Sequence, residues 1–108
     1  MSRPYRISEK AIEDLENIWI YSSKTWSAEQ ADRYYKLIVD EIEHLTEYFE
    51  SGKDISHIEP GYRSSKVKSH LIFYVKDENG VLEVKRIYIS RWISQTGLNK
   101  APAHYSSS

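Results

Sequence analysis

The chain has 108 residues, of which 40% are hydrophobic and 29% are charged, a composition typical of one small globular domain and too apolar for a disordered chain. It contains no cysteine, which excludes a disulfide framework, a thiolate metal site and a thiol nucleophile. Its first residues carry charges without an apolar run, and no stretch approaches the ~20 apolar residues that cross a bilayer, so we expect a cytoplasmic protein without a membrane segment.

The formal net charge of −1 conceals a difference between the two parts of the chain. Residues 1–60 contain 7 Lys and Arg against 13 Asp and Glu, whereas residues 61–108 contain 8 against 3. The basic C-terminal part predicts an anionic partner, either a nucleic acid or an acidic protein. The alternative is that the acidic and basic parts pair with each other.

A short strand at residues 4–7 and two amphipathic helices are predicted in the first half. Ser8 is a typical N-cap, and apolar side chains at helical spacing predict a helix over residues 9–24. Ser27 and Gln30 form a capping-box pattern at the start of a second helix. The short connection between the helices predicts an antiparallel helical hairpin. The second helix has an apolar seam before the stop signal Gly52, made of Ala31, Tyr35, Ile38, Ile42, Leu45 and Phe49.

Beyond a predicted loop at residues 51–61, the apolar pattern changes to a period of two. In the turn between the last two strands, Asn79 and Gly80 are expected to supply positive φ angles. The predicted strands span residues 62–68, 69–76 and 81–91.

These elements predict one α+β domain over residues 1–98, with a disordered tail over residues 99–108. The expected architecture is an N-terminal strand, an antiparallel helical hairpin and then a three-stranded antiparallel β-sheet. A single helical hairpin covers only one face of such a sheet, yet both faces are apolar near its centre. One face is expected to carry Leu71, Phe73, Val75, Leu82, Val84 and Tyr88. The other is expected to carry His70, Ile72, Tyr74, Ile87 and Ile89.

We expect this second face to stay uncovered within the chain and to bind a partner protein or a second copy, because exposed apolar patches mark such surfaces. The alternative is that the tail around Trp92, Ile93 and Leu98 folds back over it. A basic rim is expected around the apolar face, and it contains Arg63, Lys66, Lys68, Arg86, Arg91 and Trp92.

Several short strings, in this order and spacing, resemble the ParE toxins of the ParE/RelE superfamily. The first half contributes Tyr5-Arg6-Ile7-Ser8, Ala11, Asp14-Leu15, Ile18-Trp19, Trp26, Gln30-Ala31 and Tyr34. The second half contributes Gly61-Tyr62-Arg63-Ser64, His70-Leu71-Ile72-Phe73-Tyr74 and Val84-Lys85-Arg86-Ile87. The resemblance covers residues 5 to about 91.

The resemblance implies the toxin of a type II toxin–antitoxin pair, which inhibits DNA gyrase by binding and is neutralised by a ParD-type antitoxin. The antitoxin is expected on the uncovered face at His70, Ile72, Tyr74, Ile87 and Ile89, and the target on the basic rim. We expect no cofactor and no sequence-specific nucleic-acid binding, and the resemblance allows a homodimer within a larger complex with the antitoxin. No metal site is expected either, because His44 and His57 have no His or carboxylate at ligand spacing.

RelE-like relatives, which cut messenger RNA on the ribosome, provide the alternative function. Such a nuclease needs cations on the phosphate and an acid–base group, for which Arg63, Lys66, Arg86 and Tyr88 are the candidates, with Lys66 and Lys68 as a phosphate clamp on one strand face. A third hypothesis is an antitoxin-binding protein without toxicity, because Ile89 and Trp92 replace the usual His and Met of the family.

Several of these residues also have a purely structural interpretation. Arg63 could anchor its loop to Glu59 or to a helix acid, and His70 could be a hydrogen-bonded packing residue. Trp19 and Trp26 are expected to pack within the helical hairpin. The acidic residues of the first helix, Glu13, Asp14 and Glu16, are expected to form a solvated face.

Overall fold

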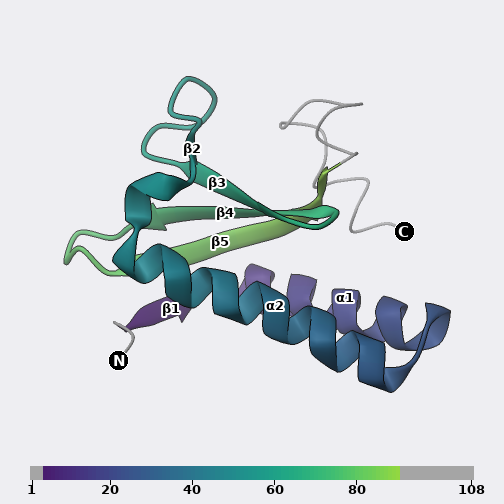
Figure 1. The fold of residues 1–108 in the computed structure, drawn as a ribbon. Coiled ribbons are helices and arrows are strands. Elements are labelled where there is room, and N and C mark those ends of the chain that lie inside the picture. Colours follow the sequence, from purple (N-terminus) through teal and green to yellow (C-terminus); the bar gives the residue numbers. More distant parts are fainter. Residues whose placement is uncertain (1–3, 91–108) are drawn as a thin grey trace.

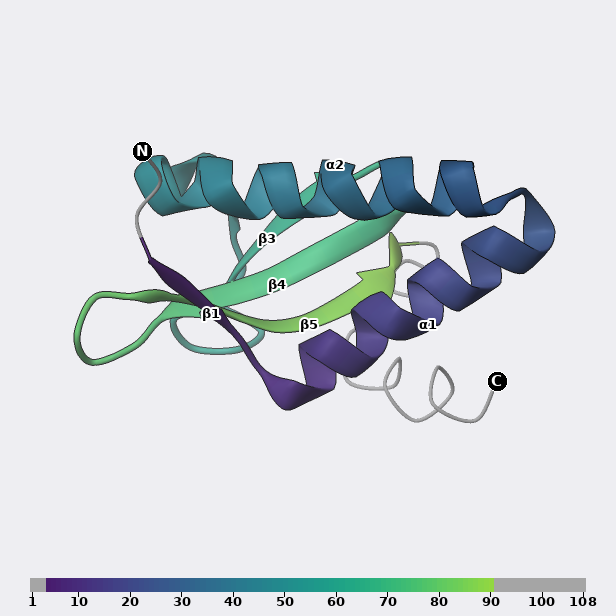
Figure 2. The same ribbon diagram turned by 90° about the horizontal axis from the view of Figure 1, so that it is seen from below.

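The computed structural model describes residues 4–90 of the chain. In chain order its elements are β1 (Tyr5–Ile7), α1 (Glu9–Thr25), α2 (Ala28–Glu47), the 3₁₀ turn η1 (Phe49–Ser51), β2 (Lys53–Asp54), β3 (Arg63–Val67), β4 (His70–Lys76) and β5 (Leu82–Ile89). The helices form one layer beneath the sheet, and the end of the hairpin that joins them extends beyond the strands (Figure 1). From the helix side, α1 and α2 diverge from this end across the sheet (Figure 2). The α+β class and the helical hairpin are confirmed.

Both predicted N-caps start their helices. The Ser8 Oγ accepts a hydrogen bond from the Ala11 N–H and the Ser27 Oγ accepts one from the Gln30 N–H, each at 3.1 Å. Helix α1 ends one residue later than predicted, and α2 ends at Glu47, after which η1 continues the chain to Gly52.

The predicted packing of the hairpin is right in part. The Trp19 Nε1 donates to the Asp32 carboxylate at 2.8 Å and so joins α1 to α2. Trp26 does not pack as expected, because it follows the last turn of α1 at the projecting end of the hairpin and is 64% exposed. Within the predicted seam of α2, Tyr35 is 43% exposed, while Ile38, Ile42 and Leu45 are fully buried.

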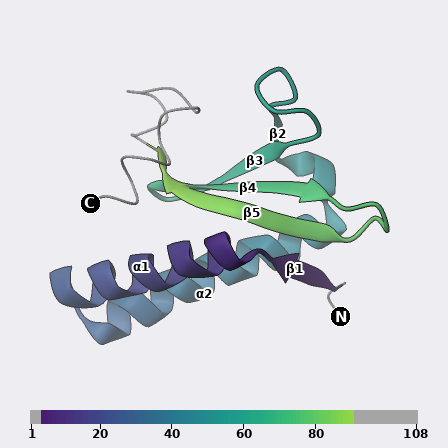
Figure 3. The same cartoon turned by 180° about the vertical axis from the view of Figure 1, so that it is seen from behind.

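The sheet is larger than the predicted three antiparallel strands. Its order is β1-β5-β4-β3-β2, with β1 parallel to β5 and all other neighbours antiparallel. Seen from behind, β1 lies beside the start of β5 (Figure 3). The short strand β2 lies within the predicted loop, where two residues are too few to produce a recognisable alternation.

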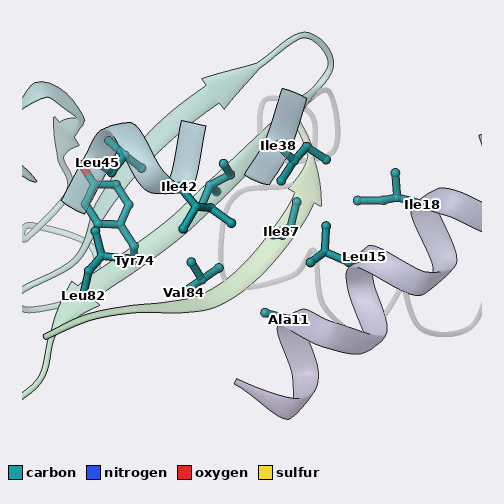
Figure 4. Packing of buried hydrophobic residues seen from close by; sticks show 11 residues of the cluster. Ala11, Leu15, Ile18, Ile38, Ile42, Leu45, Tyr74, Leu82, Val84 and Ile87 are labelled. Carbon is teal, nitrogen blue, oxygen red and sulfur yellow. The ribbon is translucent and has the colours of Figure 1, made fainter. Parts of the chain in front are cut away.

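The sheet face that was predicted to stay uncovered is the face that the two helices cover. Ile72, Tyr74 and Ile87 are each 0% exposed. They belong to the main core, in which they pack with α1 and α2 residues such as Leu15 and Ile42 (Figure 4). The prediction was wrong because both faces of β4 are apolar, so the alternation could not show which face the helices cover.

An irregularity in β5 also shifts its alternation. Phe73 pairs with Arg86, but Tyr74 pairs with Val84, so Lys85 is an extra residue in β5, as in a β-bulge. Because of it, Val84 and Ile87 both face the main core, although the sequence placed them on opposite faces.

The second apolar face is not an open patch. Phe73 and Tyr88 are each 4% exposed and form a smaller core with Ile55, which comes from the segment between β2 and β3. Leu71 and Tyr62 pack against this cluster and are half-buried. The tail that was the alternative cover, like residues 99–108, lies outside the described residues.

Two turns connect the last three strands. Gly80 has the predicted positive φ of 78°, whereas Asn79 does not, and the Asp77 Oδ1 accepts hydrogen bonds from the Asn79 and Val81 N–H groups. In the turn between β3 and β4, Lys68 has a φ of 55°. It is the only non-glycine residue with a positive φ in the described part of the chain.

Candidate partner-binding groove

The residues predicted to bind an antitoxin do not present a surface. His70 is 8% exposed and Ile72, Tyr74 and Ile87 are fully buried beneath the helices, while Ile89, which pairs with His70, is half-buried. The premise of this assignment was wrong, because the face that was expected to be uncovered is covered by the helices. The interpretation of His70 as a packing residue is confirmed, since its Nδ1 lies 2.6 Å from the Tyr34 Oη and burial lowers the pKa of His70 to about 4.

Arg63 has the structural role. Its Nη1 donates to the Gly52 carbonyl at 2.7 Å and to the Glu50 carbonyl at 3.3 Å, and the guanidinium lies 5.7 Å from the centre of the Phe49 ring. Arg63 therefore fixes the segment between η1 and β2, although its partners are main-chain carbonyls and not the predicted acids.

Arg86 is held by a buried carboxylate that the sequence analysis placed in solvent. Asp14 of α1 is 2% exposed. It accepts hydrogen bonds from the Arg86 Nε at 2.9 Å, the Arg86 Nη2 at 3.0 Å and the Ile87 N–H at 2.9 Å. The expectation for Asp14 was wrong because its carboxylate accepts a hydrogen bond from the edge of β5 at Ile87, beyond the point where β1 stops pairing with β5.

Tyr88 lies next to this ion pair. The Arg86 guanidinium is 4.7 Å from the centre of the Tyr88 ring. Burial raises the pKa of the Tyr88 hydroxyl above its usual value, and the Arg86 charge opposes this only in part. Loss of the Tyr88 proton is therefore less favourable than in a free tyrosine, which makes this hydroxyl a poor general base.

The four candidate nuclease residues do not all share one face of the sheet. Arg63 pairs with Tyr74, whose side chain faces the helices, whereas Arg86 pairs with Phe73, on the opposite face. Lys66 is exposed and, like Tyr88, pairs with Leu71, so Lys66, Arg86 and Tyr88 share the face opposite the helices. Lys68 does not share a strand face with Lys66, because Lys68 lies in the turn after β3. Arg91 and Trp92 of the predicted rim lie outside the described residues.

An open groove of about 410 Å³ lies between α2 and the outer edge of β3. Strand β2 pairs only with Arg63 and Ser64, so the rest of β3, residues 65–67, has no strand on its outer side within the part of the chain that the structure describes. An unpaired strand edge offers N–H and C=O groups to an extended chain. The groove is lined by Leu37, Asp40, Glu41 and His44 of α2 and by Lys66, Val67 and Lys68.

The walls of the groove have opposite charge and an apolar floor. Asp40 and Glu41 line the α2 side, and Lys66 and Lys68 line the β3 side, although the pairing of Lys66 with Leu71 directs its side chain to the face opposite the helices. Leu37, which also lines the groove, is 43% exposed. Two contacts join the walls, one from the Ser65 hydroxyl to the Glu41 carboxylate and one from the Tyr34 hydroxyl to the Val67 carbonyl. The arrangement can bind a polypeptide segment.

This groove was not predicted from the sequence, although a signal was available. The α2 residues that line it recur at positions 37, 40, 41 and 44, which is the spacing of one helical stripe. The apolar seam on the other side of α2 is stronger, so it determined the interpretation of this helix.

Residues 4–90 contain no group of three His, Asp or Glu side chains that could hold a metal ion. No helix among the residues that the structure describes is long and apolar enough to pass through a bilayer.

Comparisons with known proteins identify similar sequences and a similar fold. Residues 5–91 match the family described as the ParE toxin of the type II toxin–antitoxin system parDE. The chain is 38% identical over 72 residues to Toxin ParE1 of Caulobacter vibrioides, which covers 67% of this chain and 75% of the relative. It is 31% identical over 91 residues to Toxin ParE1 of Mycobacterium tuberculosis, which covers 84% of this chain and 93% of the relative.

A solved structure described as the chromosomal ParDE TA system from P. aeruginosa has a chain of similar fold. Its TM-score is 0.68 at 18% sequence identity, and the match covers 80% of this chain and 94% of that chain. The likeness concerns the fold, since the identity is low.

Proposed function

The chain belongs to the ParE toxin family of type II toxin–antitoxin systems, and we propose that it arrests growth by binding DNA gyrase and is neutralised by a ParD-type antitoxin. Both encounters would take place in the cytoplasm. The toxin acts in this proposal as a binding protein and not as an enzyme.

The engagement of the candidate nuclease residues supports binding over catalysis. Arg63 is committed to main-chain carbonyls and Arg86 to Asp14, so neither cation is available to stabilise charge on a phosphate without loss of a structural contact. Tyr88 is buried, with a raised pKa.

The observation that carries the antitoxin part of the proposal is the groove between α2 and β3. An extended antitoxin segment would continue the sheet along residues 65–67 and place an apolar side chain over Leu37 and Val67. An acidic side chain of the segment would meet Lys68, and another on the opposite face of the added strand would meet Lys66. A second copy of the chain fits less well, because edge-to-edge pairing would bring like charges together.

Calorimetry with the product of the reading frame next to the gene, where a cognate antitoxin is expected, tests this docking site. The double variant Lys66→Glu with Lys68→Glu should weaken binding at least about tenfold, with the loss largest at low salt. Lys10→Glu with Lys24→Glu makes the same charge change on α1, away from the groove, and should bind like the natural chain. Equal affinities for both double variants would contradict the docking site.

A supercoiling assay with purified gyrase tests the target. The protein should inhibit supercoiling, and added antitoxin should restore it. Cleaved transcripts with translation arrest, and unaffected gyrase, would instead favour the RelE-like ribonuclease. Tight antitoxin binding without inhibition would indicate a member that has lost toxicity. The homodimer within a larger complex stays a prediction, which light scattering on the purified complex measures.

A further inference from the structure

The hydroxyl of Tyr34 on α2 lies at the centre of the turn between β3 and β4. Its Oη is 3.2 Å from the Val67 carbonyl, 3.4 Å from the Ser69 Oγ and 2.6 Å from the His70 Nδ1. Three of the four turn residues therefore contact this one oxygen. The fourth is Lys68, the residue with a φ of 55°.

Counting protons limits which of these hydrogen bonds can form together. A tyrosine hydroxyl has a single proton, and a carbonyl oxygen can only accept. If the Tyr34 hydroxyl donates to the Val67 carbonyl, the short contact with His70 is a hydrogen bond only when the His70 Nδ1 donates to the Tyr34 Oη. A neutral imidazole has one N–H, so His70 then has its proton on Nδ1, and the order is His70 to Tyr34 to Val67.

This chain of hydrogen bonds surrounds a strained residue. A lysine with a positive φ is unfavourable and persists where neighbouring contacts determine the backbone. Lys68 is exposed, and with Val67 it lines the groove. The contacts of Tyr34 therefore hold both the edge of β3 and the turn residue that faces a bound segment.

We propose that Tyr34 is a positioning residue, which acts with an Nδ1-protonated His70 to hold the β3–β4 turn so that Lys68 faces the antitoxin segment in the groove. The inference rests on the proposed function of the groove. It assigns no contact with the antitoxin to Tyr34 itself.

A double-mutant cycle on antitoxin affinity tests whether Tyr34 acts through Lys68. Tyr34→Phe removes only the hydroxyl and should weaken binding about five- to tenfold. The same change in a Lys68→Ala background should cost less than about twofold, because the positioned side chain is already absent. A loss of the same size in both backgrounds would overturn the proposal, since Tyr34 would then act without Lys68.

Two variants of His70 refine the cycle. Asparagine can place an amide N–H near the position of Nδ1, so His70→Asn should keep the affinity within about twofold of the natural chain. His70→Leu removes the donor and should lose about as much affinity as Tyr34→Phe. Circular dichroism at the assay temperature establishes that each variant is folded. Equal affinities for the Asn and Leu variants would contradict the role of the Nδ1 proton.

Nitrogen-15 NMR of the free protein separates this inference from the proposed function. The His70 signals should show the Nδ1–H tautomer at neutral pH, and Tyr34→Phe should shift them toward the Nε2–H tautomer. An Nε2–H tautomer in the natural chain would overturn the inference even if the antitoxin binds the groove. An Nδ1–H tautomer together with no antitoxin binding would instead refute the function of the groove, and the positioning role with it.

Discussion

At the scale of single residues, Asp14 joins α1 to the free edge of β5 through three hydrogen bonds to Arg86 and Ile87. Removal of one member of a buried ion pair leaves the other charge unpaired, which typically costs about 3–5 kcal/mol. Asp14→Ala should therefore lower the free energy of unfolding by about 3 kcal/mol or more, as measured by urea denaturation.

Asp14→Asn is the matched control for this prediction. The amide retains an oxygen that can accept from the Ile87 N–H but has no charge for Arg86, so its loss of stability should be smaller. If the urea midpoint of the Ala variant equals that of the natural chain, Asp14 is not the support that its geometry indicates.

His70 makes the stability of the protein depend on pH. Burial lowers its pKa to about 4 in the folded state from 6.5, although the charge of Asp14 on α1 opposes the shift. Between these values the unfolded chain binds more protons than the folded one, so stability decreases as the pH falls. The contribution of His70 to this loss is about 3 kcal/mol.

Thermal unfolding at pH 7 and pH 4.5 measures this effect. His70→Asn has no ionisable group at this position, so its melting temperature should fall less over this range than that of the natural chain. The other groups of the protein titrate in both proteins and cancel in the difference. Parallel decreases would show that His70 is protonated without cost in the folded state.

At the scale of elements, Gly52 allows the junction of η1 and β2 to approach β4. Its φ is −75°, so its backbone does not require glycine. Space does, because a Cβ would overlap the Tyr74 hydroxyl and lie 2.9 Å from the Ser64 carbonyl oxygen. Gly52→Ala should lower the free energy of unfolding by about 2 kcal/mol.

A second variant tests the cause of this loss. Tyr74→Phe removes the overlapped oxygen, at the cost of its 2.7 Å hydrogen bond to the Phe49 carbonyl. Gly52→Ala should therefore be less destabilising in the Tyr74→Phe background than in the natural chain. If the two substitutions have additive effects on the free energy of unfolding in chemical denaturation, the loss in Gly52→Ala does not come from a clash with the Tyr74 hydroxyl.

The helices could be predicted well from the sequence because their signals are local. Ser8 and Ser27 cap helices within a few residues of themselves, and the apolar side chains repeat along one segment. The pairing of β1 with β5 could not be predicted in this way, because it joins Tyr5–Ile7 to Leu82–Val84. Nor could the extra residue Lys85, since a bulge interrupts the period on which the prediction depends.

The candidate site was harder to predict than the fold. The groove depends on where β2 stops pairing with β3 and on which face α2 covers, and both are properties of the tertiary structure. The basic residues Lys66 and Lys68 could be selected from the sequence, but their position beside the groove could not be predicted. Arg63 and Arg86 look equally available in the sequence, and only the structure shows that each is committed to a structural partner.

At the scale of the whole molecule, the acidic and basic parts of the chain meet in two ion pairs. Arg6 pairs with Asp77, and Asp14 pairs with Arg86. The alternative to an anionic partner, in which acids of the first part pair with bases of the second, is realised among the described residues by Asp14 and Arg86. The pair of Arg6 with Asp77 has the opposite sense, since the first part supplies the base and the second part the acid. Lys66 and Lys68 remain exposed at the groove.

The same two lysines lie at the unpaired edge of β3. Lysine on an edge strand discourages pairing with another copy, so Lys66→Val with Lys68→Val should make the isolated protein self-associate. Size-exclusion chromatography over a concentration series measures this. Lys10→Val with Lys24→Val adds the same apolar groups to α1 and should remain at the elution volume of the natural chain. Identical elution of both double variants would show that the edge needs no such protection.

The pairing of β1 with β5 has a consequence for how the protein is made. Its first strand is translated early, yet it stays without a neighbour until Leu82–Val84 have left the ribosome. At roughly 10 residues per second, the nascent chain waits for several seconds with its sheet incomplete. Premature termination before this point leaves Tyr5–Ile7 without its partner strand, so a truncated chain cannot complete the sheet.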